Sequence, residues 1–470
     1  AFFVSITFRT MKQRLLKVFF ICMAAVFLPQ ITHAAGDIEI NATNFPDENF
    51  RNWLSWTDYG YDGILTEEEI KKVVSLDVKR CKIRSLQGIE YFTALDSLDC
   101  SVNQLTVLDV SKNTKLTYLN CGSNQLTVLD VSKYATLTTL NCYNNQLTAL
   151  DVSKNTKLID LDCSKNQLTV LNVSKNTALT ELRCYGNKLT ALDVSKNIVL
   201  QYLRCHDNQL TALDVSKNTA LQYLLCANNQ LTALDISVNT ALECLTCDEN
   251  YLTALDVSKN TKLTQLICNG NKLTVLDVSK CTVLYYLSCH ENQLTALNVS
   301  GCTALTKLGC EENQLTTLDV SGCTALTYLG CYDNQLTTLN VSGCTALNLL
   351  YCYNNKIKGI SMDNLVKSLP INSTNKPFQL YVYSSVSLNE ENLCTKTQVK
   401  TAKEKGWKVL YEYEAYKWTD YEGSDDTPSN INDIRTEVGK DAPVYDLRGQ
   451  RLMAPHKGIN IIGGRKVVVK

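Results

Sequence analysis

The sequence predicts a β-rich solenoid, placed in the α/β class by convention, with a parallel sheet along one face. Three observations predict it. Leucines recur at a strict period of 21 residues from Leu95 to Leu347, which gives thirteen consecutive units. Within each unit apolar and polar residues alternate, as in a short strand with one buried face. One unit alone buries too little apolar surface to offset the ordering of its backbone, so units must stack.

Composition places the chain among ordinary folded proteins and excludes several functions. It has 470 residues, of which 45% are hydrophobic and 20% charged, and its net charge is −1. Such a balance does not favour a nucleic-acid partner, and the apolar content is too high for general disorder. The 21 cysteines stand beside only four histidines, which does not suit an array of zinc fingers.

The N-terminal segment is predicted to be an export signal. Residues 1–10 precede Met11 and are expected to be upstream sequence carried along by a misplaced start. Over residues 11–35, a basic start leads to an apolar stretch at 18–28 and then to small residues. This order is typical of a secretory signal peptide and is too short for a membrane span, although a buried N-terminal helix is the alternative. We expect the mature chain to leave the cytoplasm.

Residues 36–72 are predicted to form a helical N-terminal cap. Phe50, Trp53 and Leu54 lie at helical spacing, and a second short helix fits residues 67–74. The twelve residues between these helices resemble an EF-hand loop, which implies one weakly held calcium ion. The resemblance assigns its ligands to Asp58, Asp62, the backbone of Ile64, Thr66 and Glu69.

Two features of this loop leave another interpretation open. Gly60 stands at the third place, where an EF-hand loop supplies a ligand. Thr66 and Glu69 also match the capping box of the following helix, and Asp62-Gly63 is a turn signal. A calcium site and a plain helix cap therefore remain alternatives.

The repeats occupy residues 73–367, beginning with a degenerate unit of 22 residues at 73–94. Each of the thirteen regular units approximates L-x-x-L-x-C-x-x-N-Q-L-T-x-L-D-V-S-K-N-T-x, with places counted from its first leucine. Leu at places 1, 4, 11 and 14, Cys at place 6 and Val at place 16 are predicted to point inward. Because each strand arrives in the same phase, the strands are expected to stack in register as a parallel sheet.

The pattern L-x-x-L-x-C/L-x-x-N is similar to the leucine-rich repeat. The 21-residue form with L-D-V in its second half looks like the class called IRREKO, which is common in secreted Bacteroidetes proteins. The resemblance implies a curved solenoid with its parallel sheet on the concave side, a surface that usually holds other molecules. Because the second half of each unit nearly copies the first, we expect short strands or turns on the convex side rather than a helix.

The cysteines are predicted to be buried free thiols that fill a narrow coil. Thirteen of them, from Cys100 to Cys352, occupy place 6. A disulfide ladder is the alternative, because export favours oxidation, but side chains one strand spacing apart exceed the usual Cβ separation of a disulfide. Cys244 and Cys247 form a C-x-x-C whose side chains are expected on opposite faces. A second file replaces Asn at place 19: Cys281, Cys302, Cys323 and Cys344.

Three polar files are assigned to structure rather than to function. The Asn at place 9, from Asn103 to Asn355, is predicted to hydrogen-bond the backbone of adjacent coils. Asp or Asn at place 15 and Lys at place 18, such as Asp130 and Lys133, are predicted to form charge rows on the back, where each pair contributes little.

The places that vary between units are the candidate binding surface, because packing consumes the repeated places. Tyrosine dominates places 3 and 7, which point outward, and suits both protein contacts and sugar stacking. The alternative is that these side chains only shield the strands. The tyrosines are Tyr118, Tyr143, Tyr185, Tyr202, Tyr223, Tyr286, Tyr328, Tyr332 and Tyr353.

Charged residues accompany the tyrosines. Arg183 and Arg204, at place 5 of adjacent units, predict a small basic spot. Carboxylates at the loop-proximal places of the later units predict a preference for a basic partner there. These carboxylates are Asp248, Glu249, Glu291, Glu311, Glu312 and Asp333.

Three segments follow the repeats. Residues 368–413 alternate strand signals with a Lys-rich helix and are predicted to form a C-terminal cap, and residues 414–430 a polar linker. Residues 431–470 resemble the C-terminal sorting domain of the Bacteroidetes type IX secretion route. The resemblance implies transport across the outer membrane and anchoring at the cell surface. The alternative is a small β-module with no sorting role.

No catalytic constellation is evident. His206, His290 and His456 are far apart in the repeat arithmetic, and G-x-S-x-G is absent. We therefore predict a non-enzymatic, secreted or surface-exposed protein that binds a protein or adheres through the concave face. A glycan receptor and a structural surface protein are the alternatives. Apart from calcium we expect no cofactor, no nucleic acid and no membrane span.

Overall fold

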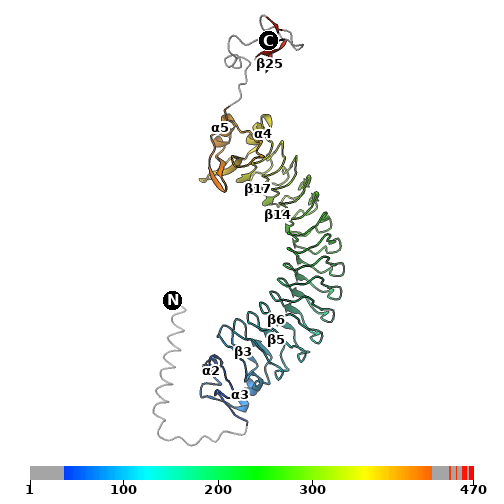
Figure 1. Ribbon diagram of the computed structural model, residues 1–470, viewed down its shortest axis with the longest axis vertical. Coiled ribbons are helices and arrows are strands. Elements are labelled where there is room, and N and C mark those ends of the chain that lie inside the picture. The colour runs from blue at the N-terminus through cyan, green and yellow to red at the C-terminus, as the bar shows by residue number, and fades with distance from the viewer. Residues whose placement is uncertain (1–35, 426–443, 446–450, 453–457, 463–464, 470) are drawn as a thin grey trace, which may run out of the picture. The chain divides into compact units, whose positions relative to one another are not determined.

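The computed structural model describes residues 36–425, 444–445, 451–452, 458–462 and 465–469. Contacts within the chain divide it into two compact units, one ending at Leu147 and the other beginning at Thr148. The predicted export signal lies outside the described residues. The predicted repeat solenoid is confirmed in both units, as the following strands show (Figure 1).

The N-terminal unit begins with the predicted helical cap. Helix α2 (Glu48–Leu54) starts at Asp47, whose side chain accepts the Phe50 N–H at 2.9 Å. Helix α3 (Glu67–Lys72) follows the antiparallel pair β1 (Ile38–Glu39) and β2 (Ile64–Leu65). The first coils then form a parallel sheet in chain order, with one 3₁₀ turn, η1 (Ile89–Tyr91). Its strands are β3 (Ser75–Asp77), β4 (Ser97–Asp99), β5 (Tyr118–Asn120) and β6 (Thr139–Asn141).

The C-terminal unit contains a longer parallel sheet of three-residue strands. Each strand residue lies opposite the residue 21 positions further along, for example Leu203 opposite Leu224, so the predicted register is confirmed. In Figure 1 strands β14 and β17 lie on the inner side of the coils of this unit. The strands are β7 (Asp160–Asp162), β8 (Glu181–Arg183), β9 (Tyr202–Arg204), β10 (Tyr223–Leu225), β11 (Cys244–Thr246), β12 (Gln265–Ile267), β14 (Tyr286–Ser288), β16 (Lys307–Gly309), β17 (Tyr328–Gly330) and β18 (Leu349–Tyr351).

The back of the coils is made of turns and a few short strands, as predicted. Throughout residues 92–359, all of which the structure describes, there is no helix. Strands β13 (Val275–Asp277) and β15 (Ala296–Asn298) pair in parallel there, and Asp319 forms a bridge with Asn340. The turns and short strands of the back therefore follow from the near-duplication of the two halves of each unit.

The interior matches the predicted inward places. Leu at places 1 and 4 and Cys at place 6 are fully buried in all thirteen regular units, as are Leu at place 11 of the first twelve and Ile357 of the last. Leu at place 14 keeps an edge of at most 9% exposed, at Leu297, but Ile360 at this place of the last unit is 69% exposed, because a helix of the C-terminal cap begins there. The C-x-x-C is split as expected, since Cys247 is buried inside the coil and Cys244 is half-buried on the outer face of its strand. All cysteines of the described residues carry free thiols.

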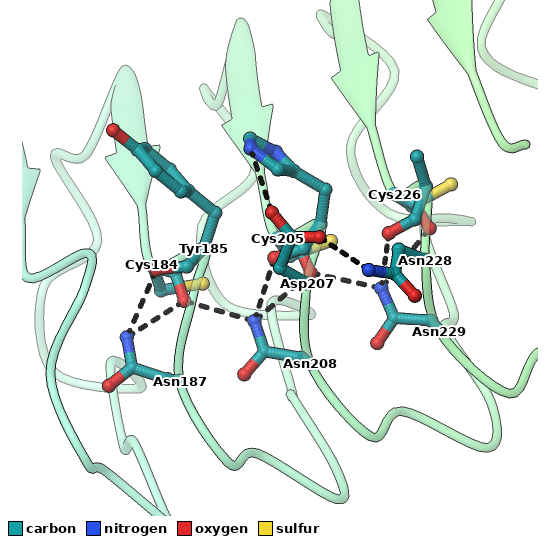
Figure 2. Close-up of polar contacts among 11 residues, drawn as sticks. Cys184, Tyr185, Asn187, Cys205, Asp207, Asn208, Cys226, Asn228 and Asn229 are labelled. Carbon is teal, nitrogen blue, oxygen red and sulfur yellow. Dashed lines mark hydrogen bonds and ion pairs between the residues drawn. The ribbon is translucent and has the colours of Figure 1, made fainter. Parts of the chain in front are cut away.

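A ladder of asparagine amides joins consecutive coils at place 9. In Figure 2 the Nδ2 of Asn229 donates to the carbonyl oxygens of Cys205, Cys226 and Ala227, each at 3.1 Å. Its Oδ1 accepts the N–H of Leu210 at 2.9 Å. Asn208 and Asn187 repeat this arrangement one and two coils earlier, respectively. One buried amide thus satisfies backbone groups of two coils, which confirms the predicted role of this file.

The second file, at place 19, is less completely satisfied. Nδ2 of Asn218 donates to Val194 O and Asn197 O, but its buried Oδ1 has no partner among the described residues. In the later coils cysteine replaces this asparagine. Its thiol reaches the same place-16 carbonyl, as Cys302 Sγ does to Val278 O at 3.2 Å. The substitution keeps one weak hydrogen bond and removes the unpaired oxygen.

Glycines beside these thiols permit a close approach of the coils. A Cβ added at Gly301 would lie 2.0 Å from Ser279 O, and one at Gly322 would lie 2.7 Å from Ser300 O. Any side chain there would separate consecutive coils, which explains why Gly replaces the usual Lys of place 18 in these units.

The C-terminal cap extends the sheet. Strand β19 (Phe378–Ser384) pairs in parallel with β18, β20 (Trp407–Glu414) pairs in parallel with β19, and β21 (Lys417–Asp420) closes the edge antiparallel to β20. Helices α4 (Ile360–Ser368) and α5 (Lys396–Glu404) accompany these strands. The cap therefore continues into residues that we predicted to begin the linker.

The described part of the tail forms a small β-module. Its four strands are antiparallel in the order β23 (Arg451–Leu452), β22 (Val444–Tyr445), β24 (Gly458–Ile462) and β25 (Arg465–Val469). In the described residues no helix combines the length and apolarity that crossing a bilayer requires.

The amide ladder generates a stability prediction. Replacing Asn229 with Ala leaves the Leu210 N–H buried without a partner and removes one of the two amide hydrogen bonds to each of the Cys205 and Cys226 carbonyls. The change should lower the free energy of unfolding by about 2 kcal/mol. Urea denaturation monitored by circular dichroism measures the change. Gln230→Ala, at the adjacent exposed place, is the control and should change stability by less than about 0.5 kcal/mol. Equal effects of the two changes would contradict the role of the ladder.

The buried thiols generate a second prediction. A native chain that begins at residue 36 should react with a thiol reagent mainly at Cys81 and Cys244, since the other thiols are buried and burial raises the pKa of Cys121, for example, to about 12. After unfolding without reductant, all 20 should react. A large deficit of reactive thiol in the unfolded, unreduced protein would show that disulfides connect the coils.

Candidate functional site

The outward side chains at places 3, 5 and 7 form one surface of the sheet, which we call the sheet face. All nine predicted tyrosines lie on it and are partly exposed. Tyr118 and Tyr143 belong to the N-terminal unit, and the other seven to the C-terminal unit. The prediction that places 3 and 7 point outward is therefore confirmed, and the following geometry concerns the C-terminal unit.

Register brings aromatic rings together in the middle of this sheet. Tyr202 and Tyr223 face each other across β9 and β10 with ring centroids 4.8 Å apart and planes 11° apart. Tyr185 and His206 stack at 4.3 Å and 9°. Tyr286 lies between Gln265 and Lys307 in register, so it has no aromatic partner across its strand. Each stacked pair covers one face of each of its rings.

The predicted basic spot is wrong for Arg183. Its guanidinium lies 3.1 Å from an Asp160 oxygen and 2.6 Å from a Glu181 oxygen, with an Asp162 oxygen at 3.9 Å. Three carboxylates in adjacent strands therefore surround one cation, and the local charge is not basic. Arg204 lies next to Arg183 in register, and its buried Nε has no hydrogen-bond partner among the described residues.

A second aromatic cluster lies where the last coils meet the C-terminal cap. Tyr332 and Tyr353 stack at 4.6 Å and 8°, and Tyr351 stacks on Tyr381 at 4.1 Å and 12°. The Trp418 ring packs edge-on against Tyr381 at 4.7 Å and lies 5.0 Å from Tyr353.

Three members of this cluster were not predicted from the sequence. Tyr351 occupies place 5, which also points outward, so the repeat arithmetic could have identified it. Tyr381 and Trp418 come from β19 and β21 of the cap, and only the pairing of those strands with β18 and β20 brings them to the sheet face.

Carboxylates without counter-ions lie beside this cluster. Within the described part of the chain, Glu311, Glu312 and Asp333 take part in no ion pair, whereas Glu291 lies 3.5 Å from His290 Nδ1. Burial, followed by the neighbouring Glu312 and Glu412, raises the pKa of Asp333 to about 6. Burial also raises the pKa of Glu311, whose Oε2 is buried without a hydrogen-bond partner among the described residues.

The carboxylates at place 8 stand on an unusual backbone. Every residue at this place has a positive φ, including Glu249 at 50°, Glu291 at 51° and Glu312 at 53°. Gly186 and Gly270 occupy the same place in other coils without strain. For a residue with a Cβ this conformation costs about 1–2 kcal/mol. The glutamates are therefore not there for backbone geometry.

A groove separates these carboxylates from a loop of the cap. Its volume is about 750 Å³. On the cap side, a Glu391 oxygen lies 3.5 Å from Lys356 Nζ, and its other oxygen lies 3.5 Å from Lys358 Nζ. We call it the end groove, and its lining includes Glu312, Asp333, Asn354, Lys356, Asn389 and Glu391.

The loop that resembles a calcium site is arranged as a helix cap. Glu69 Oε2 accepts hydrogen bonds from the Thr66 N–H at 2.9 Å and Oγ1 at 2.7 Å, and Asp62 Oδ1 accepts the Ile64 N–H at 3.1 Å. Asp58 does not join Asp62 and Glu69 in a metal site, and the described residues contain no group of three acidic, His or Cys side chains that could hold a metal. As placed, these residues form the capping box, and calcium binding stays a prediction that calorimetry at millimolar calcium can test.

Comparison with known proteins places this geometry in context. The functional domain of internalin J from Listeria monocytogenes, which includes a cysteine ladder, is 31% identical, with 90% of this chain and 94% of that one covered and a TM-score of 0.63. The internalin InlF from the same species is 25% identical over 71% of this chain and 97% of its own, with a TM-score of 0.54.

Two further comparisons cover less. A curated sequence of internalin J from L. monocytogenes is 40% identical over 71 residues, which are 15% of this chain and 8% of that protein. The plant peptide hormone receptor RGFR1 in complex with RGF2 is 20% identical, with 70% and 60% covered and a TM-score of 0.53, and it shares the fold alone. No family model matches the chain.

The raised pKa of Asp333 generates a prediction about stability. The Asp333 carboxyl holds its proton more tightly in the folded chain than in the unfolded chain. The protein therefore loses stability as the pH rises from 3.8, the ordinary pKa of this group, through 6, its pKa in the folded chain. Asp333→Asn should therefore stabilise the protein at pH 7.5 by about 1 kcal/mol, after discounting for solvent screening of a half-buried group. The gain should nearly vanish at pH 4, and thermal melting at both pH values measures it.

A matched variant controls for the loss of one charge. Asp214 lies on the back, where the Ser216 N–H donates to its carboxylate at 2.8 Å and lowers its pKa. Asp214→Asn should therefore not stabilise the protein at pH 7.5. If Asp214→Asn stabilised the protein as much as Asp333→Asn does, the effect would come from the change in net charge and not from the burial of Asp333.

Proposed function

The chain belongs to the internalin-like leucine-rich repeat proteins, and on that premise we propose that it binds a protein partner through its sheet face. The observation that carries the proposal is the pair of aromatic clusters on the outward places of the sheet, one at Tyr202 and Tyr223 and one at Tyr332 and Tyr353. Tyrosine offers a large rigid contact at low entropic cost, and it is enriched where protein interfaces gain most of their free energy.

The ring geometry favours a protein over a glycan. Sugar rings stack on open aromatic faces, but in these two pairs one face of each ring lies against the other tyrosine, with centroids less than 5 Å apart. Ring edges and hydroxyls remain, and these suit the hydrogen bonds and apolar contacts of a protein surface. A glycan receptor and a structural surface protein stay alternatives that the same experiment can identify.

Binding without catalysis agrees with the state of the two histidines on the sheet face. His206 is stacked on Tyr185, and burial lowers its pKa. His290 lies beside Glu291. Neither histidine is in contact with a nucleophilic hydroxyl or thiol in the hydrogen bonds of the described residues, so we propose a non-enzymatic role.

We further propose that the protein acts outside the cytoplasm. Support comes from the signal-like segment at residues 11–35 and from the tail at 431–470, whose described strands form a β-module. The tail would direct the chain across the outer membrane and anchor it. Removal of residues 431–470 in the native host should then abolish digestion of the chain by protease added to intact cells.

The role of the sheet face can be tested by substitution. A partner captured from extracellular protein should first be identified by mass spectrometry. Replacing Tyr202, Tyr223 and Tyr286 together with Ser should then weaken its binding at least thirtyfold by surface plasmon resonance, about 2 kcal/mol, because aromatic anchors are removed.

Tyr251→Ser supplies the matched control, since Tyr251 is exposed at place 10, off the sheet face, beside Lys272. It should leave affinity unchanged. Unchanged affinity of the triple variant would exclude the central cluster, and binding on a glycan array without any protein partner would favour the glycan alternative.

A further inference from the structure

We propose that the end groove binds a basic segment of the protein partner, with arginine or lysine side chains opposite Glu312 and Asp333. This deepens the proposed function and rests on it, because it names the chemistry of one part of the interface. Sequence analysis predicted only that the later units prefer a basic partner, whereas the structure locates a groove and its walls.

The carboxylates on one wall of the end groove have no cationic partner among the described residues. One wall of the groove carries Glu312 and Asp333, and no Lys or Arg pairs with either within the described residues. Glu311 lies next to them along the chain and is equally unpaired. The opposite wall carries Glu391 paired with both Lys356 and Lys358, so it holds one positive charge more than it holds negative charge. A cationic side chain entering from a partner would therefore face the Glu312 wall.

These carboxylates also repel one another. Glu312 lies close enough to both Glu311 and Asp333 to raise the pKa of each, in addition to their burial. Glu412 of the cap also raises the pKa of Asp333. Glu412 is buried, and its carboxylate accepts hydrogen bonds from Ser384 Oγ and the Tyr416 N–H. Like charges held together without a counter-ion attract an incoming cation, which relieves their repulsion, and this attraction offsets the cost of desolvating the cation.

The kind of cation follows from the spread of the carboxylates. No three acidic side chains of the described residues converge closely enough to hold a metal ion. A guanidinium or ammonium group on a flexible stem can instead reach carboxylates on successive coils, which repeat about every 4.8 Å along the sheet. The groove volume of about 750 Å³ accommodates several side chains.

The neighbouring aromatic cluster completes the surface. Tyr332 and Tyr353 stand at place 7 of the coils that carry Asp333 and Asn354 at place 8. Their hydroxyls and ring edges can pack on the apolar stem of a lysine or arginine whose charged end lies in the groove.

The experiment uses the full chain and two synthetic probes. One fluorescein-labelled peptide of twelve residues alternates Arg and Ser, and the other alternates Glu and Ser. Fluorescence anisotropy at pH 7.5 should show binding of the Arg peptide alone. The double variant Glu312→Gln, Asp333→Asn should weaken it about tenfold, and added salt should reduce binding of the wild type more than that of the variant.

A second double variant removes the same charge from the back. This variant, Asp214→Asn with Asp256→Asn, changes two exposed carboxylates that accept the N–H groups of Ser216 and Ser258. It should bind the Arg peptide like the wild type. Both variants should keep the wild-type circular dichroism spectrum. Equal weakening by the two variants, or no weakening by the first, would overturn the proposal.

The outcomes separate this proposal from the proposed function. If an identified protein partner depends on Tyr202 and Tyr223 but not on Glu312 and Asp333, the groove proposal fails and the proposed function stands. If the Arg peptide binds as expected but no protein depends on the tyrosines, the proposed function fails. Binding of neutral glycans that is lost in the groove variant would also overturn the proposal, by making the groove a sugar site.

Discussion

The structure depends on the in-register stacking of identical coils, which the buried asparagine at place 9 makes possible. A coil of 21 residues must turn several times, and each turn leaves backbone groups that no strand can pair. One amide per coil serves the carbonyls of two coils and an N–H of the preceding one, as Asn229 does. Each buried polar group without such a partner would cost about 1–3 kcal/mol.

This register also determines what the sheet face can present. Any side chain at an outward place lies directly beside its counterparts in the neighbouring coils, about 4.8 Å away. Aromatic residues therefore become stacks, and carboxylates become rows whose members repel one another. At Arg183 a cation lies among the acids, whereas at Asp333 burial, and after it the neighbouring Glu312 and Glu412, raises the pKa of the carboxyl.

The later coils of the C-terminal unit differ from the earlier ones in a coordinated way. On the back, cysteine and glycine replace asparagine and lysine at places 19 and 18, which removes an unpaired oxygen and lets the coils approach closely. On the sheet side, acidic residues are more frequent at places 7 and 8 of the later coils, whereas the positive φ of place 8 is common to all thirteen coils.

The sequence by itself determined the coil: its length, its inward leucines and cysteines, the structural asparagines and the outward tyrosines all follow from a period of 21 and an alternation of two. It also left the thiols and the calcium-like loop with alternatives, since spacing does not show which partner a polar atom takes. Only the tertiary structure decided that Arg183 is surrounded by acids, that Glu69 caps a helix, and that Trp418 joins Tyr353. These contacts connect residues from different coils or from the cap, and their distances depend on register and side-chain direction, which a repeat pattern does not specify for residues outside it.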